Sequence, residues 1–164
     1  MLTDTIYGIL ADANDKLACD RLVKAKGRDP DKAFIVLIAD PAQIWDRASR
    51  DAFVSVADQL GPEPTSVVVP AGESTPEWLP RAEDGTIAFR RPADEELVRL
   101  LRQTGPLLAP SANPQGELPA LNIKEAKHYF KDEVDLYIDG GFAASRPPSR
   151  LVRPRADGTL EYLR

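Results

Sequence analysis

Apolar positions recur at two different spacings along the chain, one typical of helices and one typical of strands. Stretches with the helical spacing alternate with stretches with the strand spacing from end to end. Apolar residues at every third to fourth position predict helices over residues 13–25, 41–60, 94–103 and 123–130. Short apolar or alternating runs predict strands over residues 34–39, 65–69, 86–90, 107–109, 134–139, 150–153 and 159–163. Strands that alternate with helices in this way indicate an α/β fold.

The first two helices carry the clearest local signals. Asn14 or Asp15 is a suitable N-terminal cap for the first helix, and Gly27 is a suitable stop. The second, over residues 41–60, has apolar side chains at regular steps of four residues. We therefore expect two amphipathic helices in the first third of the chain.

The strand pattern predicts a mixed sheet. Residues 34–39 are continuously apolar and lie between Pro30 and Pro41, which is typical of a central strand buried on both faces. The two last strands flank turn residues 156–158, so they should form a hairpin. With no linker visible, we expect a single α/β domain over residues 1–164, a twisted mixed sheet with helices on its faces.

Composition narrows the choice of function. The 164 residues contain 21 Lys and Arg against 26 Asp and Glu, which excludes a globally basic nucleic-acid binder but not a local basic groove. No apolar run is long enough to cross a bilayer, and residues 1–8 lack the features of a secretory signal. The single cysteine and single histidine allow no internal disulfide and no histidine metal site. We expect a cytoplasmic protein without a membrane partner.

Polar residues suited to chemistry concentrate in a few segments between these elements. The segments are residues 3–8, residues 24–28, residues 109–113, and residues 148–150 together with Arg153, Arg155 and Arg164. The segment at 109–113 directly follows a predicted strand, and ligands of open α/β sheets bind at such strand ends. It equally suits a simple turn. Together the segments indicate an α/β domain that binds an anion or a nucleotide.

The cations at the end of the first helix have two readings. Lys24, Lys26 and Arg28 could complement only the helix dipole. If Gly27 ends the helix, however, Lys26 and Arg28 leave on an extended segment and point the same way. Two cations placed so, both predicted at the surface, suit a polyphosphate, because Arg forks onto oxygens and Lys acts as a point charge.

In their order along the chain, these segments resemble the YrdC/Sua5 family of threonylcarbamoyl-AMP synthases. The matching segments are Thr3-Asp4-Thr5-Ile6-Tyr7-Gly8, Lys26-Gly27-Arg28, residues 61–65, residues 86–92, Ala109-Pro110-Ser111-Ala112-Asn113, Asp139-Gly140-Gly141, Pro148-Ser149 and Leu163-Arg164. The family normally has a helix and a strand before the first of these motifs, so we expect this YrdC-like sheet to lack them and to expose an edge. Arg150 stands where the family has threonine, which would put a long cation into the pocket. Arg153 stands where the family often has aspartate.

The resemblance implies an L-threonylcarbamoyladenylate synthase, a nucleotidyltransferase. It would join L-threonine, bicarbonate and ATP, with Mg²⁺, into threonylcarbamoyl-AMP and pyrophosphate for tRNA t6A37 modification. By the family pattern, the catalytic residues are Lys26 and Arg28. The ATP-binding residues are Lys24, Lys26, Arg28, Ser111, Asn113 and Arg164, and the threonine-binding residues are Thr5, Arg90 and Ser149. No residue is assigned to a resident metal, and none acts as a covalent nucleophile.

An alternative is a catalytically inactive relative that binds RNA or a nucleotide. The tail is locally basic, because residues 145–164 hold five arginines against Asp157 and Glu161. Such a patch could follow the phosphates of tRNA or double-stranded RNA, although it could also be a solvated hairpin. By the resemblance, a further partner is the tRNA threonylcarbamoyl-transferase complex.

Overall fold

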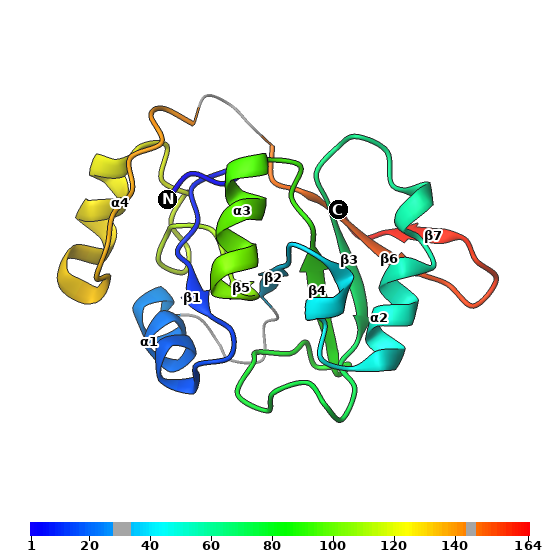
Figure 1. Ribbon diagram of the computed structural model, residues 1–164. Helices are drawn as coiled ribbons and strands as arrows, with labels where there is room; N and C mark the ends of the chain where they lie inside the picture. The colour runs from blue at the N-terminus through cyan, green and yellow to red at the C-terminus, as the bar shows by residue number, and fades with distance from the viewer. Residues whose placement is uncertain (28–33, 144–146) are drawn as a thin grey trace.

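The computed structural model describes residues 1–27, 34–143 and 147–164, and it contains one seven-stranded sheet of order β1-β5-β2-β4-β3-β6-β7 (Figure 1). The strands are β1 Ala11–Asp12, β2 Ile35–Leu37, β3 Thr65–Pro70, β4 Thr86–Arg90, β5 Leu107–Leu108, β6 Arg150–Pro154 and β7 Leu160–Tyr162. The α-helices are α1 Lys16–Lys26, α2 Arg47–Val54, α3 Glu95–Thr104 and α4 Ile123–Phe130. Short 3₁₀ helices are η1 Pro41–Gln43, η2 Ala57–Gln59 and η3 Lys131–Glu133.

The sheet is mixed, as the sequence predicts. β2 runs parallel to β4 and β3 runs parallel to β6, whereas the other neighbouring pairs are antiparallel. The predicted terminal hairpin is present, with Val152 of β6 opposite Tyr162 of β7. The caps of α1 are also confirmed: Asp15 accepts hydrogen bonds from the first turn, and Gly27 ends the helix at a φ of 57°.

Helices cover the two faces of the sheet unequally. On one face, Val67, Phe89 and Val152 join a large core that also takes in Leu22 of α1 and Phe53 of α2. On the other face, a smaller cluster packs Leu97 and Leu101 of α3 against β2 and β5, and Figure 1 shows α3 lying over these two strands. The second cluster takes no residue from β3, β4 or β6. Their side chains on that face are therefore available to line a site.

The prediction of one helix over residues 41–60 is wrong. Asp40 caps η1 by accepting from Ala42 N, and Asp46 caps α2 by accepting from Ser49 N. Between them Ile44 is extended, with φ −77° and ψ 119°, and is fully buried. Two capping side chains thus start separate helices inside a periodic apolar pattern. In the described part of the chain, no helix is long and apolar enough to cross a membrane.

The predicted strand over residues 134–139 is also absent. Leu136 and Ile138 are 70% and 45% exposed, and this described segment pairs with no strand of the sheet. It is held by side chains, because Tyr137 donates to Lys131 O and Arg21 binds Asp135. The alternating pattern of this segment is typical of a strand, but a strand forms only where a neighbouring strand can pair with it.

Candidate functional site

A cavity of about 420 Å³ lies on the sheet face that α3 covers only in part. Alternate residues of β4 and β6 form its floor, and its walls come from the first residues, the loop after β5 and the end of the chain. Its polar lining residues are Thr3, Thr5, Tyr7, Thr86, Arg90, Ser111, Ser149, Arg153 and Arg164. Segments far apart in the sequence therefore meet around one space.

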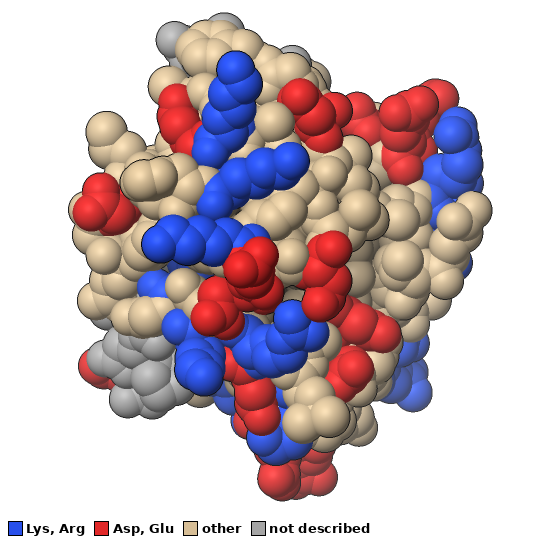
Figure 2. Space-filling view, turned by 90° about the vertical axis from the view of Figure 1, so that its left-hand side faces the viewer, with Lys and Arg blue, Asp and Glu red and all other residues tan. Residues whose placement is uncertain are grey.

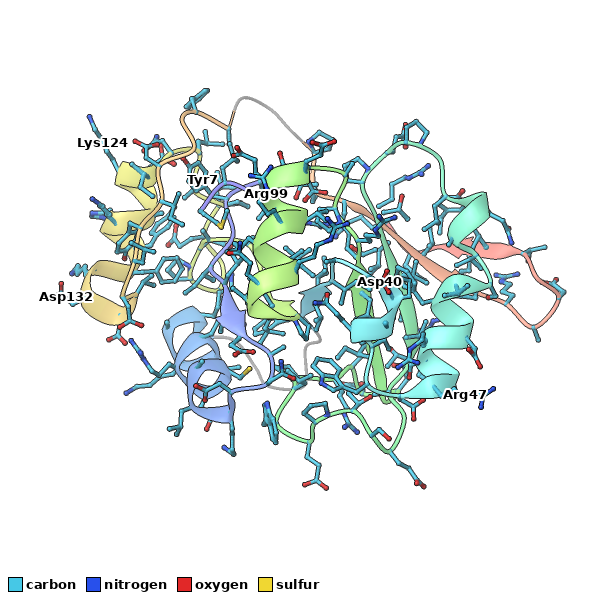
Figure 3. The ribbon with its side chains drawn as sticks, viewed as in Figure 1. Tyr7, Asp40, Arg47, Arg99, Lys124 and Asp132 are labelled. Carbon is cyan, nitrogen blue, oxygen red and sulfur yellow. The ribbon has the colours of Figure 1, made fainter. Side chains whose placement is uncertain are left out.

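The first eight residues form a pinned wall of the cavity. Gly8 N donates to Met1 O at 2.9 Å, and Leu2 bridges Tyr7 as in a hairpin. Tyr7, labelled in Figure 3, donates to Gly141 O at 2.7 Å and accepts from Gly140 N at 3.0 Å. Burial raises the pKa of this phenol, so Tyr7 stays a neutral hydrogen-bonding anchor. Hydrogen bonds thus hold this wall across its own turn and also tie Tyr7 to Gly140 and Gly141.

Arg90, the last residue of β4, places a buried cation at the cavity. Its side chain is 5% exposed; Nη2 lies 2.9 Å from Asp4 Oδ1 and 3.4 Å from Thr5 Oγ1. Burial lowers the pKa of Arg90, and the Asp4 carboxylate acts against that shift. Among the described residues, Arg90 Nε and Asp4 Oδ2 are buried without a hydrogen-bond partner. The guanidinium therefore keeps donor capacity that a ligand carboxylate suits.

The hydroxyls predicted to bind threonine lie around this arginine. Thr5 and Ser149 both line the cavity together with Arg90. Ser149 is buried, and its Oγ lies 2.9 Å from Ser66 Oγ on β3. Arg164 also lines the cavity, with Nε donating to Ser149 O at 3.2 Å. The structure thus brings Thr5, Arg90, Ser149 and Arg164 to one space.

Lys26 is buried, not at the surface as predicted, and is only 2% exposed. Its ammonium donates to Ser111 O at 2.6 Å, Asn113 O at 2.5 Å and Asn113 Oδ1 at 3.0 Å. Ser111 Oγ in turn donates to Asn113 Oδ1 at 2.6 Å. Ser111 lines the cavity, whereas Lys26 and Asn113 are not among its lining residues. The last residue of α1 therefore holds the loop that presents Ser111.

Of the other predicted phosphate-binding cations, Arg164 lines the cavity together with Ser111, whereas Lys24 does not. Lys24 is exposed and lines a second hollow, beside Glu77 and Trp78. Arg28 lies outside the described residues. The prediction that Lys24 joins the same site as Ser111 is therefore not what the structure shows, because alternate residues near a helix end point in different directions.

Arg150 lies outside the cavity and not in the pocket as predicted, whereas Arg153 lies inside it. Arg150 is absent from the lining of the described cavity: its Nη1 pairs with Glu63 at 2.9 Å, and its Nη2 donates to Thr65 Oγ1 at 3.0 Å. Arg153 does line the cavity and pairs with Asp84 at 2.6 Å. Side chains of a strand alternate between its two faces. Ser149 and Arg153 are four residues apart and therefore share a face, and this spacing is the signal that could have placed Arg153 in the cavity.

Three described arginines of the basic tail form ion pairs, whereas Arg164 donates to Ser149 O and is in no ion pair among the described residues. Arg150 pairs with Glu63, Arg153 with Asp84, and Arg155 with Glu161. Arg146, which also belonged to the predicted patch, lies outside the described residues. Each of these ion pairs neutralises one arginine of the predicted basic patch. The alternative of a tail that follows RNA phosphates is therefore not favoured.

The fold and cavity together define an α/β protein with a cavity on an open sheet face, in which a buried arginine lies among hydroxyls. The family model Sua5_yciO_yrdC, described as "Telomere recombination", matches residues 1–164. The chain belongs to this Sua5/YciO/YrdC family.

Individual relatives agree with the family match. A threonylcarbamoyl-AMP synthase of Pseudomonas fluorescens Pf-5 is 35% identical over 162 residues, covering 96% of this chain and 85% of the relative. One of strain Pf0-1 is 32% identical with the same coverage. The crystal structure of P. abyssi Sua5 complexed with L-threonine superposes with a TM-score of 0.83 at 29% identity. That match covers 99% of this chain but 48% of the P. abyssi chain, so this chain spans about half of that protein.

Proposed function

We propose that this chain is a threonylcarbamoyl-AMP synthase, which forms threonylcarbamoyl-AMP and pyrophosphate from L-threonine, bicarbonate and ATP. The observation that carries the proposal is the buried Arg90 beside Thr5 in the cavity, within a chain whose relatives have that name. A buried guanidinium with unused donors is a receptor for a carboxylate. The P. abyssi Sua5 structure is a complex with L-threonine, which has a carboxylate.

Arg90 is the proposed partner of the threonine carboxylate. Nη2 is engaged by Asp4, and Nε has no partner among the described residues. Thr5 and Ser149 supply neighbouring hydroxyls that can each donate and accept, as a threonine hydroxyl or carbamate requires. The bound amino acid would thereby be oriented with its amino group towards the open part of the cavity.

The adenylation step needs positioning and charge neutralisation more than a reactive side chain. The threonine amine adds to the carbon of bicarbonate with loss of water, and a carbamate oxygen then attacks the α-phosphorus. The bond to the β-phosphate breaks, and pyrophosphate leaves with the Mg²⁺ that entered with ATP. We assign phosphate contacts to Ser111, Arg164 and Arg28. Lys26 holds the Ser111–Asn113 loop and adds positive charge behind it.

The product determines the reaction that follows. Threonylcarbamoyl-AMP is a mixed anhydride, so it must be consumed by transfer of its acyl group to a nucleophilic amine. We propose that the acceptor is the adenosine of tRNA, through a tRNA threonylcarbamoyl-transferase complex in the cytoplasm. The cavity, with a volume of about 420 Å³, is too small to hold a tRNA nucleotide and ATP together.

Pyrophosphate release from ATP, Mg²⁺ and bicarbonate, measured with and without L-threonine, tests the proposal. We expect release that requires threonine and fails with alanine, which lacks the hydroxyl. Arg90→Lys keeps the charge but loses the fork, so the KM for threonine should rise while the KM for ATP stays unchanged. Arg150→Lys, outside the cavity on β6, is the matched control. Threonine-independent release, or none from the folded protein, would contradict the proposal.

A further inference from the structure

A second polar group lies in the cavity away from Arg90, and the proposed function leaves it unassigned. Thr86 and Arg153 both line the cavity. Thr86 shares a face of β4 with Arg90, four residues away, which separates the two by about 13 Å along the strand. Asp84, on the turn before β4, joins the two residues of this group. Its Oδ1 accepts from Thr86 Oγ1 at 2.6 Å, and its Oδ2 accepts from Arg153 Nη2 at 2.6 Å.

Asp84 determines the orientation of the Thr86 hydroxyl. An ionised carboxylate can only accept hydrogen bonds, so the hydroxyl donates its hydrogen to Asp84. Hydrogen bonds from Thr86 and then from Arg153 lower the pKa of Asp84, which keeps the carboxylate ionised at neutral pH. Towards a ligand in the cavity, Thr86 Oγ1 therefore offers lone pairs and no hydrogen.

Arg153 offers the opposite polarity. Its Nε is buried and has no hydrogen-bond partner among the described residues, so this N–H would gain from an acceptor on a ligand. Asp84 neutralises the guanidinium, and an anion would also face the lone pairs of Thr86 Oγ1. Arg164, which lines the same cavity and is in no ion pair within the described part of the chain, suits a phosphate better. Arg153 is thus left for a neutral group of the ligand.

The floor beside these polar groups is apolar and has small side chains. Val68 of β3 lies opposite Ala88 of β4, and both line the cavity together with Ala82 and Leu151. A flat, uncharged ring can lie against such a surface. A phosphate or carboxylate there would lose its water without receiving donors in exchange. The chemistry of this part of the cavity therefore favours a heteroaromatic ring with one donor and one acceptor on its edge.

We propose that Thr86 and Arg153 recognise the adenine edge of ATP and thereby determine the nucleotide specificity of the enzyme. Adenine has an amino donor beside a ring nitrogen that accepts. The amino group would donate to Thr86 Oγ1, and the ring nitrogen would accept from Arg153 Nε. Asp84 is not among the lining residues and acts as a positioning residue, because it fixes the polarity of Thr86. The inference rests on the proposed function, which supplies ATP as a substrate.

Nucleotide competition tests the specificity on the full chain. ATP labelled with a fluorophore on its ribose is bound in the presence of Mg²⁺ and displaced by unlabelled ATP, ITP or GTP. Hypoxanthine and guanine carry an oxygen where adenine has its amino group, and that oxygen would face the lone pairs of Thr86. ATP should therefore bind at least about tenfold more tightly than either ITP or GTP.

The three nucleotides separate the outcomes. ITP lacks the 2-amino group of GTP, so equal affinity for ITP and ATP would show that the site senses only size, and would overturn the inference. Failure to bind any of the three would overturn it as well. Binding does not require turnover. A preference for adenine without threonine-dependent pyrophosphate release would therefore contradict the proposed function and leave this inference standing.

Two substitutions test the assigned residues. Thr86→Val keeps the shape of the side chain and removes the acceptor, so ATP should bind about tenfold more weakly while the KM for L-threonine stays unchanged. Asp84→Asn brings an amide that can donate to Thr86, which frees the hydroxyl to donate into the cavity. The preference for ATP over ITP should then fall to about threefold or less. Equal weakening of both nucleotides would indicate a purely structural role and would overturn the assignment.

The terminal hairpin repeats the same turn outside the cavity. Asp157 Oδ1 accepts from Thr159 Oγ1 at 2.7 Å and from Thr159 N at 3.0 Å, as Asp84 Oδ1 does from Thr86. Neither Asp157 nor Thr159 lines the cavity. Asp157→Asn and Thr159→Val are therefore matched controls, and the preference for ATP over ITP should stay within about twofold of wild type.

A second control addresses net charge, because Asp84→Asn also removes one negative charge. Figure 2 faces the α4 side of the molecule and shows Lys and Arg interleaved with Asp and Glu. Asp132, labelled beside α4 in Figure 3, allows the same change of charge there. Asp132→Asn should keep the wild-type preference for ATP over ITP. If it loses that preference as Asp84→Asn does, charge and not the polarity of Thr86 sets the specificity, and the inference is wrong.

Discussion

Replacing Lys26 by methionine should destabilise the fold strongly, although a lysine at a helix end is ordinarily a surface residue. Lys26 is 2% exposed, and its ammonium makes three hydrogen bonds of 3.0 Å or shorter to Ser111 and Asn113. A hydrogen bond to a charged group contributes about 1.5–3 kcal/mol, and a buried carbonyl left without its donor costs about 1–3 kcal/mol. Recovered desolvation of the ammonium offsets part of this sum. We expect a net loss of about 3 kcal/mol.

For a chain of this size, that loss corresponds to a Tm lower by about 6–12 °C. Thermal unfolding followed by circular dichroism, together with urea titration, measures it. Lys24→Met is the matched control, because Lys24 lies on the same helix but is exposed, and its free energy of unfolding should change by less than about 0.5 kcal/mol. If Lys26→Met is as stable as Lys24→Met, the ammonium does not anchor the Ser111–Asn113 loop, and our account of that wall is wrong.

Three further substitutions or modifications test other parts of the structure. Asp4→Asn leaves the buried Arg90 guanidinium without its counter-ion, so it should cost about 3 kcal/mol in urea titration and raise the KM for threonine. Gly72→Ala should lower Tm in a calorimetric scan, because the new Cβ would lie 1.9 Å from Cγ of Asp46, whose carboxylate caps α2. Burial, aided by nearby aspartates, raises the pKa of Cys19 to about 12, so a thiol reagent at pH 8 should react only after unfolding; rapid reaction of the native protein would refute its burial.

Features that depend on a few neighbouring residues could be predicted from the sequence. β4 over Thr86–Arg90 and α4 over Ile123–Phe130 have the predicted bounds. Asp15 and Gly27 cap α1 as expected, and the terminal hairpin follows from its turn residues. In each case the signal and the structure lie within the same short stretch, so local geometry decides the outcome.

Features that depend on distant partners could not be predicted. Residues 134–139 alternate like a strand, yet no described strand lies beside them. Lys26 has the sequence context of a surface cation, and its burial comes from Ser111 and Asn113, which follow it by more than eighty residues. The pairing of Arg90 with Asp4 is equally remote in sequence. A pattern within one segment contains no information about which other segment arrives next to it.

The faces of the strands decide which cations belong to the site. Alternation fixes that Thr86 and Arg90 share one side of β4, and that Arg150 and Arg153 point to opposite sides of β6. It does not fix which side α3 covers, and that coverage is what leaves the cavity open. Once α3 is placed, Arg153 lies inside the cavity and Arg150 outside it. Arg150, which the resemblance predicted to put a long cation into the pocket, therefore leaves the pocket free. Arg153 on the same strand contributes to the lining of the cavity instead.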